Sequence, residues 1–368
     1  MEKTKKQMRI SNIELLRFFS ILLVVLHHVA IHTNWINGNS DAFLAFKFLM
    51  ILGGKVGVDL FVIISGYLLI NSRAKVSSLS RTIAETAVFS IVMYLFVIIF
   101  NINGNAFSFS YLIKRIFPVA FNDYWFVTAY VLMYLFLPLI LPTLKSMSRD
   151  TYRYTLIIGF VVVFIWPLIW LKNGMNFSYS VFFVYLFTLG GGIKKFDIKI
   201  KPSIGIGLAT LFSVLGVIAT FLIRNGLSLP HNRIIFKILD FFGWTTGWRE
   251  NIFIWFDASP LPLLIAFCLF TSIMSLPYFY NNMINYFGKH VFGAYLFQSA
   301  PLFSPWIYQT FIDLNRVHGT ILRVGTAIAV AIVLTFIGII LHTVLAPVAK
   351  KYSQLLSRFL TYKINKEV

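Results

Sequence analysis

Apolar segments of membrane-spanning length recur along the whole chain, separated by short polar connections. A helix crosses a bilayer with about 20 mainly apolar residues, and an open sheet cannot satisfy its backbone polar groups there. Candidate spans occupy residues 13–32, 53–71, 83–101, 125–142, 154–171, 179–193, 203–223, 255–276, 290–311 and 320–346. The pattern predicts an all-α integral membrane protein with about ten transmembrane helices. The segment at 179–193 is short and ends in three glycines, so it could be broken or re-entrant.

Charged residues are scarce and unevenly placed. They make up 12% of the 368 residues, against about 25% in soluble domains, which excludes an ordinary soluble protein. The net charge of +19 comes from basic clusters between apolar segments, as the positive-inside rule describes, and not from a basic face that would bind nucleic acid. An even number of spans puts both termini on one side, and Lys and Arg are in excess on that side. We therefore predict cytoplasmic termini.

We expect one transmembrane domain over residues 1–368, with a basic cytoplasmic tail at 350–368 and no appended soluble domain. The first apolar segment has no clean small-residue cleavage site, so we interpret it as a retained helix and not as a signal peptide. Cys268 is the one cysteine, which precludes an intramolecular disulfide and a cysteine-based metal site. The sequence also has no glycine-rich phosphate loop, paired-histidine zinc motif or nucleophile elbow. We predict no metal site and no permanently bound cofactor.

Three ionisable residues lie along one face of the first apolar segment, namely Glu14, Arg17 and His28. Such groups are costly within a bilayer and indicate a functional site. Arg17 and His28 are eleven residues apart, which aligns them to within roughly 20° and separates them by about 16 Å along a helix. A neutral imidazole can act as a general base, and an arginine can hold a phosphate or carboxylate. The alternatives are a structural histidine and an arginine that snorkels to the interface.

A further candidate, Asp59, lies within the next apolar segment, after a glycine-rich stretch. Its carboxylate could orient a catalytic group, pair with a buried cation or cap the helix. Small residues around it would let neighbouring helices approach closely. These residues are Gly53, Gly54, Gly57, Ser65 and Gly66.

Aromatic and charged residues near the ends of the spans are candidates for substrate binding. Trp125 lies at the entry to the segment at 125–142, and Trp244, Trp248 and Arg249 lie in a long extracytoplasmic stretch near 224–254. Indole rings can stack on sugar faces while charged groups bond to hydroxyls. The alternative is an aromatic belt at the membrane interface.

Four stretches of the chain carry a family pattern. Arg17 and His28 keep a fixed spacing, and Gly57-Val-Asp59-Leu-Phe-Val-Ile-Ile-Ser-Gly-Tyr follows in the second segment. Residues 124–138 contain a Trp-Phe…Tyr-Leu…Pro pattern, and residues 287–298 contain a Gly…Tyr-Leu pattern. Together they resemble the membrane-bound acyltransferase family 3, which includes bacterial enzymes that O-acetylate cell-surface polysaccharides. The resemblance covers nearly the whole chain.

The resemblance implies that an acyl group, by our leading hypothesis acetyl, passes from cytoplasmic acyl-CoA to a glycan hydroxyl near the outer face. It makes His28 the catalytic base and Arg17 a residue that organises the site and the donor. Gln298 stands where many members of the family carry a histidine. We also expect Asp59 to orient the imidazole, and Glu14 and Arg73 to help bind the donor. Acetyl-CoA would act as a co-substrate.

Two other functions stay open at the level of sequence. A flippase or exporter of a lipid-linked glycan or small acyl compound would use the same charges as a substrate path, and would need no acyl-CoA. A non-catalytic subunit of a glycan synthase would lose complex assembly, and not acylation, on replacement of His28. The expected partners are a glycan or lipid-linked glycan, membrane lipid and glycan-assembly proteins, and the expected location is the bacterial cytoplasmic membrane.

Overall fold

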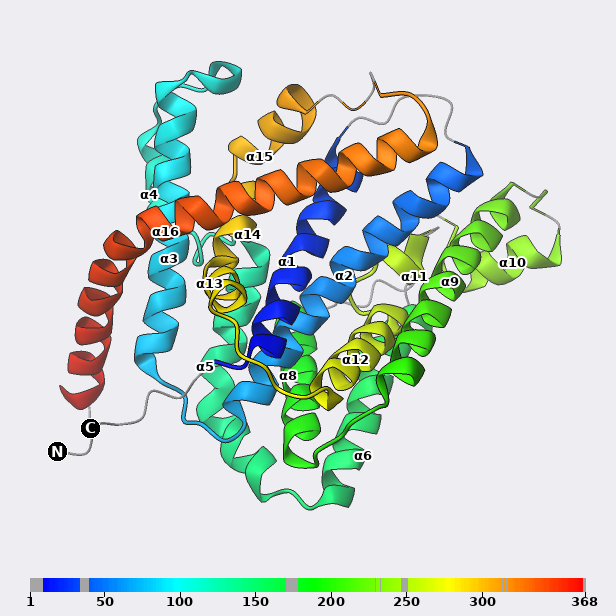
Figure 1. Ribbon diagram of the computed structural model, residues 1–368, viewed down its shortest axis with the longest axis horizontal. Coiled ribbons are helices and arrows are strands. Elements are labelled where there is room, and N and C mark those ends of the chain that lie inside the picture. Colours follow the sequence, from blue (N-terminus) through cyan, green and yellow to red (C-terminus); the bar gives the residue numbers. More distant parts are fainter. Residues whose placement is uncertain are drawn as a thin grey trace.

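The computed structural model describes residues 9–33, 40–169, 178–228, 230–231, 233–245, 251–312, 314 and 317–366. Every regular element within these ranges is a helix (Figure 1). Seven of the described helices are long and apolar enough to cross a membrane. They are α1 (Ser11–His32), α2 (Asp41–Leu69), α3 (Val76–Ile99), α5 (Trp125–Ser146), the continuous α6–η2–α7 helix (Arg149–Ile169), α9 (Pro202–Leu227) and α16 (Thr320–Lys366). The predicted all-α membrane fold is confirmed, whereas the larger number of spans and the cytoplasmic termini stay predictions.

Helix α8 (Tyr179–Lys195) runs without interruption through its three glycines, so the alternative of a broken helix is wrong. The glycines face neighbouring helices. A Cβ at Gly190 would overlap the backbone carbonyl of Ile63 on α2, and a Cβ at Gly192 would press on the ring of Tyr152. The missing side chains therefore serve close helix packing and do not break the helix.

The continuous span predicted at 290–311 is wrong, because this region is a series of short helices. These are α13 (Asn282–His290), α14 (Phe292–Gln298), α15 (Phe303–Trp306) and η5 (Ile307–Phe311). Leu302 has φ = 66° and lies between Pro301 and Ser304-Pro305. Proline lacks a backbone donor and blocks a continuous helix. The segment predicted at 255–276 is mainly one helix, α12 (Pro260–Ser275), which begins later than expected because residue 255 ends a separate short helix, α11 (Ile252–Trp255).

Helices α1 and α2 lie side by side in the middle of the bundle (Figure 1). Gly54 packs against His27, and Gly57 packs against the backbone carbonyl of Ser20, with no room for a Cβ at either glycine. The prediction that small residues bring neighbouring helices together is confirmed. Helix α2 is also the most buried of the seven candidate spans. The close pairing brings polar side chains of α1 and α2 into one site.

The ends of the bundle differ in what they carry (Figure 1). The basic connections α2–α3, α5–α6 and α8–α9 gather at the end where α1 begins. Helices α4 (Phe109–Ile116) and α10 (Ile234–Phe241) lie toward the opposite end, where α1 finishes. Helix α16 packs against α1, α3 and α14 and bends near Pro347, as expected of a proline inside a helix. Arg17 therefore lies nearer the basic end of the bundle, and His28 farther from it.

Candidate active site

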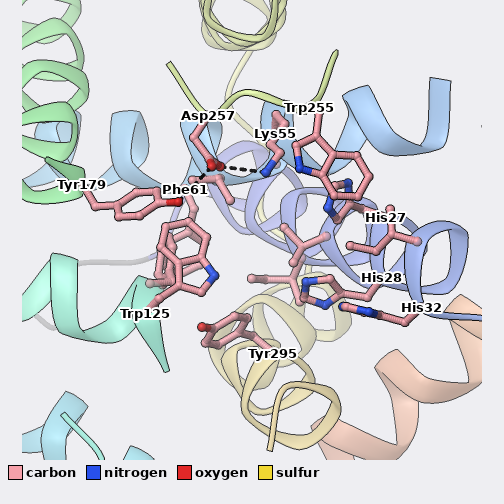
Figure 2. Close-up of a pocket in the computed structure, with 17 residues that line it drawn as sticks. His27, His28, His32, Lys55, Phe61, Trp125, Tyr179, Trp255, Asp257 and Tyr295 are labelled. Atoms are coloured by element: carbon pink, nitrogen blue, oxygen red, sulfur yellow. Dashed lines mark hydrogen bonds and ion pairs between the residues drawn. The ribbon is translucent and has the colours of Figure 1, made fainter. Parts of the chain in front are cut away.

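A cavity of about 270 Å³ lies beside α1 and α2, with walls completed by α5, α8, α14 and the α11 region (Figure 2). We call it the histidine cavity. Its polar and aromatic lining consists of His27, His28, His32, Lys55, Phe61, Trp125, Phe126, Tyr179, Trp255, Asp257 and Tyr295. The cavity thus combines an apolar body with a few polar groups that converge on it, as small-molecule sites do.

His28 is held in one tautomer by its hydrogen bond. Its Nδ1 lies 2.5 Å from Oε1 of Gln298, which also accepts the hydroxyl of Tyr308 at 2.7 Å. The amide nitrogen of Gln298 donates to the Ser299 hydroxyl at 2.6 Å, and in this orientation the amide oxygen faces Nδ1 of His28. Since an amide oxygen only accepts, Nδ1 of His28 carries the proton and Nε2 keeps its lone pair. His28 is therefore prepared to accept a proton at Nε2.

The two histidines that flank His28 have different surroundings. His27 Nδ1 donates to the carbonyl of Ile51 at 2.8 Å, which ties α1 to α2. His32 lies one turn beyond His28, with ring centroids 5.3 Å apart. Sequence reasoning did not single out His32, although its four-residue spacing from His28 places both on one helix face.

An ion pair occupies the opposite wall of the histidine cavity (Figure 2). Lys55 Nζ lies 2.9 Å from one carboxylate oxygen of Asp257, and the Tyr179 hydroxyl donates to the other at 3.3 Å. Lys55 and Asp257 are each 12% exposed. The pairing lowers the cost of placing these charges in an apolar bundle, and Lys55 keeps further N–H donors for a ligand.

Asp59 does not perform the orienting role that we expected of it. Its side chain is fully buried, and neither carboxylate oxygen has a hydrogen-bond partner within the residues that the structure describes. It is also not part of the cavity lining. Gln298 takes the position of hydrogen-bond partner to His28. The expectation failed because this partner comes from a helix 270 positions along the chain.

A second cavity, of about 310 Å³, opens toward the basic end of the bundle. We call it the arginine cavity, since its charged lining is Arg9, Arg17, Arg81, Glu85 and Lys289. Behind this lining, one oxygen of the buried Glu14 accepts from Arg9 at 2.9 Å and from Arg17 at 3.0 Å. Glu14 thus holds the two guanidinium groups together and does not itself line the cavity.

Two phenylalanines line both cavities. Phe61 on α2 and Phe126 on α5 belong to the walls of the histidine cavity and of the arginine cavity. Their rings meet edge to face, with centroids 5.6 Å apart. The cavities are therefore neighbours separated by an aromatic pair, with cations on one side and imidazoles on the other.

The remaining predicted residues fall in different places. Trp125 lines the histidine cavity, with its ring centroid 4.6 Å from that of Tyr179. Trp244 instead packs in the α10 region and donates to the Leu168 carbonyl at 3.2 Å. Arg73 is exposed and is not among the residues that line the arginine cavity, where Arg81 is found. Trp248 and Arg249 lie outside the described residues.

Other residues of the site could not be found from local pattern. Tyr308 and Asp257 reach it through tertiary contacts alone, and Trp255 belongs to a short helix that looked like the start of a longer span. No cluster of three or more His, Cys, Asp or Glu side chains suited to a metal ion occurs among the described residues.

Comparison with known proteins identifies the family. The sequence matches the family model for an acyltransferase domain over residues 10–345. Neither a search of curated proteins nor a search of solved structures gives a match. The matched region contains the histidine cavity, the arginine cavity apart from Arg9, and all seven candidate spans except the end of α16. This multi-pass membrane protein therefore belongs to the membrane-bound acyltransferase family 3.

Proposed function

We propose that this protein transfers an acetyl group from acetyl-CoA to a hydroxyl of a cell-surface or lipid-linked glycan in the bacterial cytoplasmic membrane. The observation that carries the proposal is His28 itself. Gln298 leaves its Nε2 free to accept a proton, at a cavity whose neighbour is lined by three arginines and a lysine. Glycan-assembly proteins are the expected partners.

The arginine cavity suits the diphosphate of the donor. Arg9, Arg17, Arg81 and Lys289 outnumber the acidic groups near them, and guanidinium groups bind phosphate in a bidentate manner. Arg17 and His28 are separated by about 16 Å along α1. The pantetheine arm of the donor would cover this distance once the rings of Phe61 and Phe126, which meet edge to face, move apart. This path brings the thioester from the basic end of the bundle to the imidazole.

The reaction follows from the tautomer of His28. Nε2 removes the proton of the glycan hydroxyl while the oxygen attacks the thioester carbonyl, forming the new C–O bond. The tetrahedral intermediate collapses, the C–S bond breaks, and the thiolate of CoA takes the proton back from the imidazolium. Gln298 accepts the hydrogen bond from Nδ1–H of His28 throughout, and the Lys55 ammonium adds positive charge while the oxyanion exists. The acetyl group passes directly to the acceptor.

The aromatic wall of the histidine cavity suits a sugar. Trp125 packs against Tyr179 with the two rings tilted. Trp255 lies on the far side, and its ring centroid is 6.0 Å from that of His27. Aromatic faces pack against the C–H face of a pyranose ring, while Lys55 and Asp257 can exchange hydrogen bonds with its hydroxyls. The acceptor would therefore bind between the tryptophans with one hydroxyl toward His28.

Kinetics with acetyl-CoA test the donor part of the proposal. The protein in lipid nanodiscs, supplied with lipid-linked glycan extracted from bacterial membranes, should release CoA. Arg17→Gln should raise the KM for acetyl-CoA about tenfold or more, because it removes a charge-assisted bond to phosphate. Arg153→Gln, which removes an exposed arginine outside both cavities, is the matched control and should keep the original KM. No CoA release by the unmodified protein, or equal KM values for the two variants, would contradict the proposal.

A further inference from the structure

A third cavity, of about 390 Å³, lies beside the arginine cavity, between α3, α13 and the second half of α16. We call it the α16 cavity. Its ionisable lining consists of Arg81, Glu85, Lys289, His290, His342 and Lys350. Three of these residues also line the arginine cavity, namely Arg81, Glu85 and Lys289. The two cavities therefore share a charged wall.

The α16 cavity contains buried polar groups that packing alone does not require. His290 and His342 are 5% and 2% exposed, and their Nδ1 atoms lie 2.9 Å apart, so one of the two must donate to the other. His342 Nε2 lies 3.6 Å from Glu85 Oε1 and has no hydrogen-bond partner within the described residues. A buried N–H or lone pair without a partner is costly, and a bound polar ligand would supply the partner.

The charge of the α16 cavity matches a dianion. Arg81 donates to Glu85 at 2.9 Å, so these two charges compensate each other. Lys289 and Lys350 have no ion-pair partner in the part of the chain that the structure describes. With neutral histidines the lining carries three positive charges and one negative charge, a net of +2. A phosphomonoester carries about −1.5 to −2 at neutral pH.

We infer that the α16 cavity binds a phosphomonoester, and that its source is the 3′-phosphate on the ribose of the acyl-CoA donor. This inference rests on the proposed function. Coenzyme A carries two separate anionic groups, a diphosphate and a 3′-phosphomonoester. The two adjoining cationic cavities, which share Arg81 and Lys289, could each hold one of these groups. The diphosphate would bind in the arginine cavity and the 3′-phosphate near Lys350. The site therefore distinguishes CoA from 3′-dephospho-CoA.

The test compares acetyl-CoA with acetyl-3′-dephospho-CoA in neutral phosphatidylcholine nanodiscs. We expect a KM about tenfold higher for the dephosphorylated donor, with kcat unchanged, because one charge-assisted contact is lost. Lys350→Gln should reduce the ratio of the two KM values to near one, whereas Lys351→Gln should keep it. Both lysines are exposed on α16, but only Lys350 lines the cavity. Equal KM values for the two donors in the unmodified protein would overturn the inference.

Binding measurements separate this inference from the proposed function. Titration with CoA and with 3′-dephospho-CoA reports the same preference without any transfer. A preference that Lys350→Gln abolishes, in a protein that transfers no acetyl group, would support the site and contradict the acetyltransferase. Acetyl transfer without a preference for CoA over 3′-dephospho-CoA would support the acetyltransferase and contradict the site. A repeat in nanodiscs with phosphatidic acid tests the other source of a phosphomonoester. Binding of this lipid that depends on Lys350, together with equal affinity for the two nucleotides, would overturn the assignment to CoA.

Discussion

Replacement of His28 with alanine is expected to lower kcat for acetyl transfer by about 10²–10⁴-fold, the range typical of a general base. The reason is the free Nε2 of an imidazole whose Nδ1 is committed to Gln298. Without the imidazole of His28, no other side chain that lines the histidine cavity is held at this position to accept the proton of the glycan hydroxyl. The KM for acetyl-CoA should change little, since the phosphate-binding residues lie in the neighbouring cavity. Initial rates of CoA release measure both constants.

The control for this variant is His231→Ala. His231 is exposed and stacks on Phe236 in the α10 region, outside both cavities, so its loss should leave the rate unchanged. Thermal unfolding in detergent shows whether each variant is folded. Full activity of folded His28→Ala would contradict the mechanism. If acylation persists but a glycan-synthase complex fails to assemble, the protein is a subunit and not the catalyst.

Replacement of Gln298 with leucine is expected to lower kcat by roughly 10- to 100-fold, by analogy with the loss found when the partner that orients a metal-bound histidine is removed. Leucine has a similar volume but no acceptor, so Nδ1 of His28 loses its partner and the imidazole can adopt the other tautomer. The Tyr308 hydroxyl also loses its acceptor. Gln298 acts through His28 and is therefore a positioning residue.

Gln298→Glu is the variant that separates orientation from simple destabilisation. A carboxylate keeps an acceptor oxygen for both His28 and Tyr308, so activity should recover to within a few-fold of the unmodified protein. The measurement is kcat for the two variants, with thermal unfolding as a check on the fold. Equal losses of kcat in the leucine and glutamate variants would show that Gln298 does not act by accepting the hydrogen bond from Nδ1–H of His28.

Much of the fold could be predicted from the sequence, because the bilayer restricts spanning segments to apolar helices. Seven such helices are found where apolar segments were expected. The wrong predictions concern segments that have the apolar composition of a span but contain prolines or glycines, which change how the backbone folds and packs. Residues 290–311 are apolar enough for a span, but the helix breaks at Pro301 and Leu302, between α14 and α15. The glycines at 190–192 looked like a break and are instead a packing surface against α2 and α6.

The candidate site was only partly predictable, for a different physical reason. Arg17 and His28 could be found because ionisable groups in an apolar helix are costly and conspicuous. Their partners could not, since they come from distant parts of the chain. Gln298 reaches His28 from α14, and Arg81 of α3 joins Arg17 in place of the exposed Arg73. Sequence spacing places residues on one helix face, but it does not show which helix lies opposite.

The most direct test of the account is transfer of an isotopically labelled acetyl group across oriented proteoliposomes. Labelled acetyl-CoA is supplied at the face where α1 begins, lipid-linked glycan is present in the membrane, and the glycan is then analysed by mass spectrometry. We predict label in ester linkage on a glycan hydroxyl with the unmodified protein, and none with His28→Ala. Movement of unlabelled glycan without any acetylation would identify a carrier, and equal labelling by His28→Ala would contradict the role assigned to the imidazole.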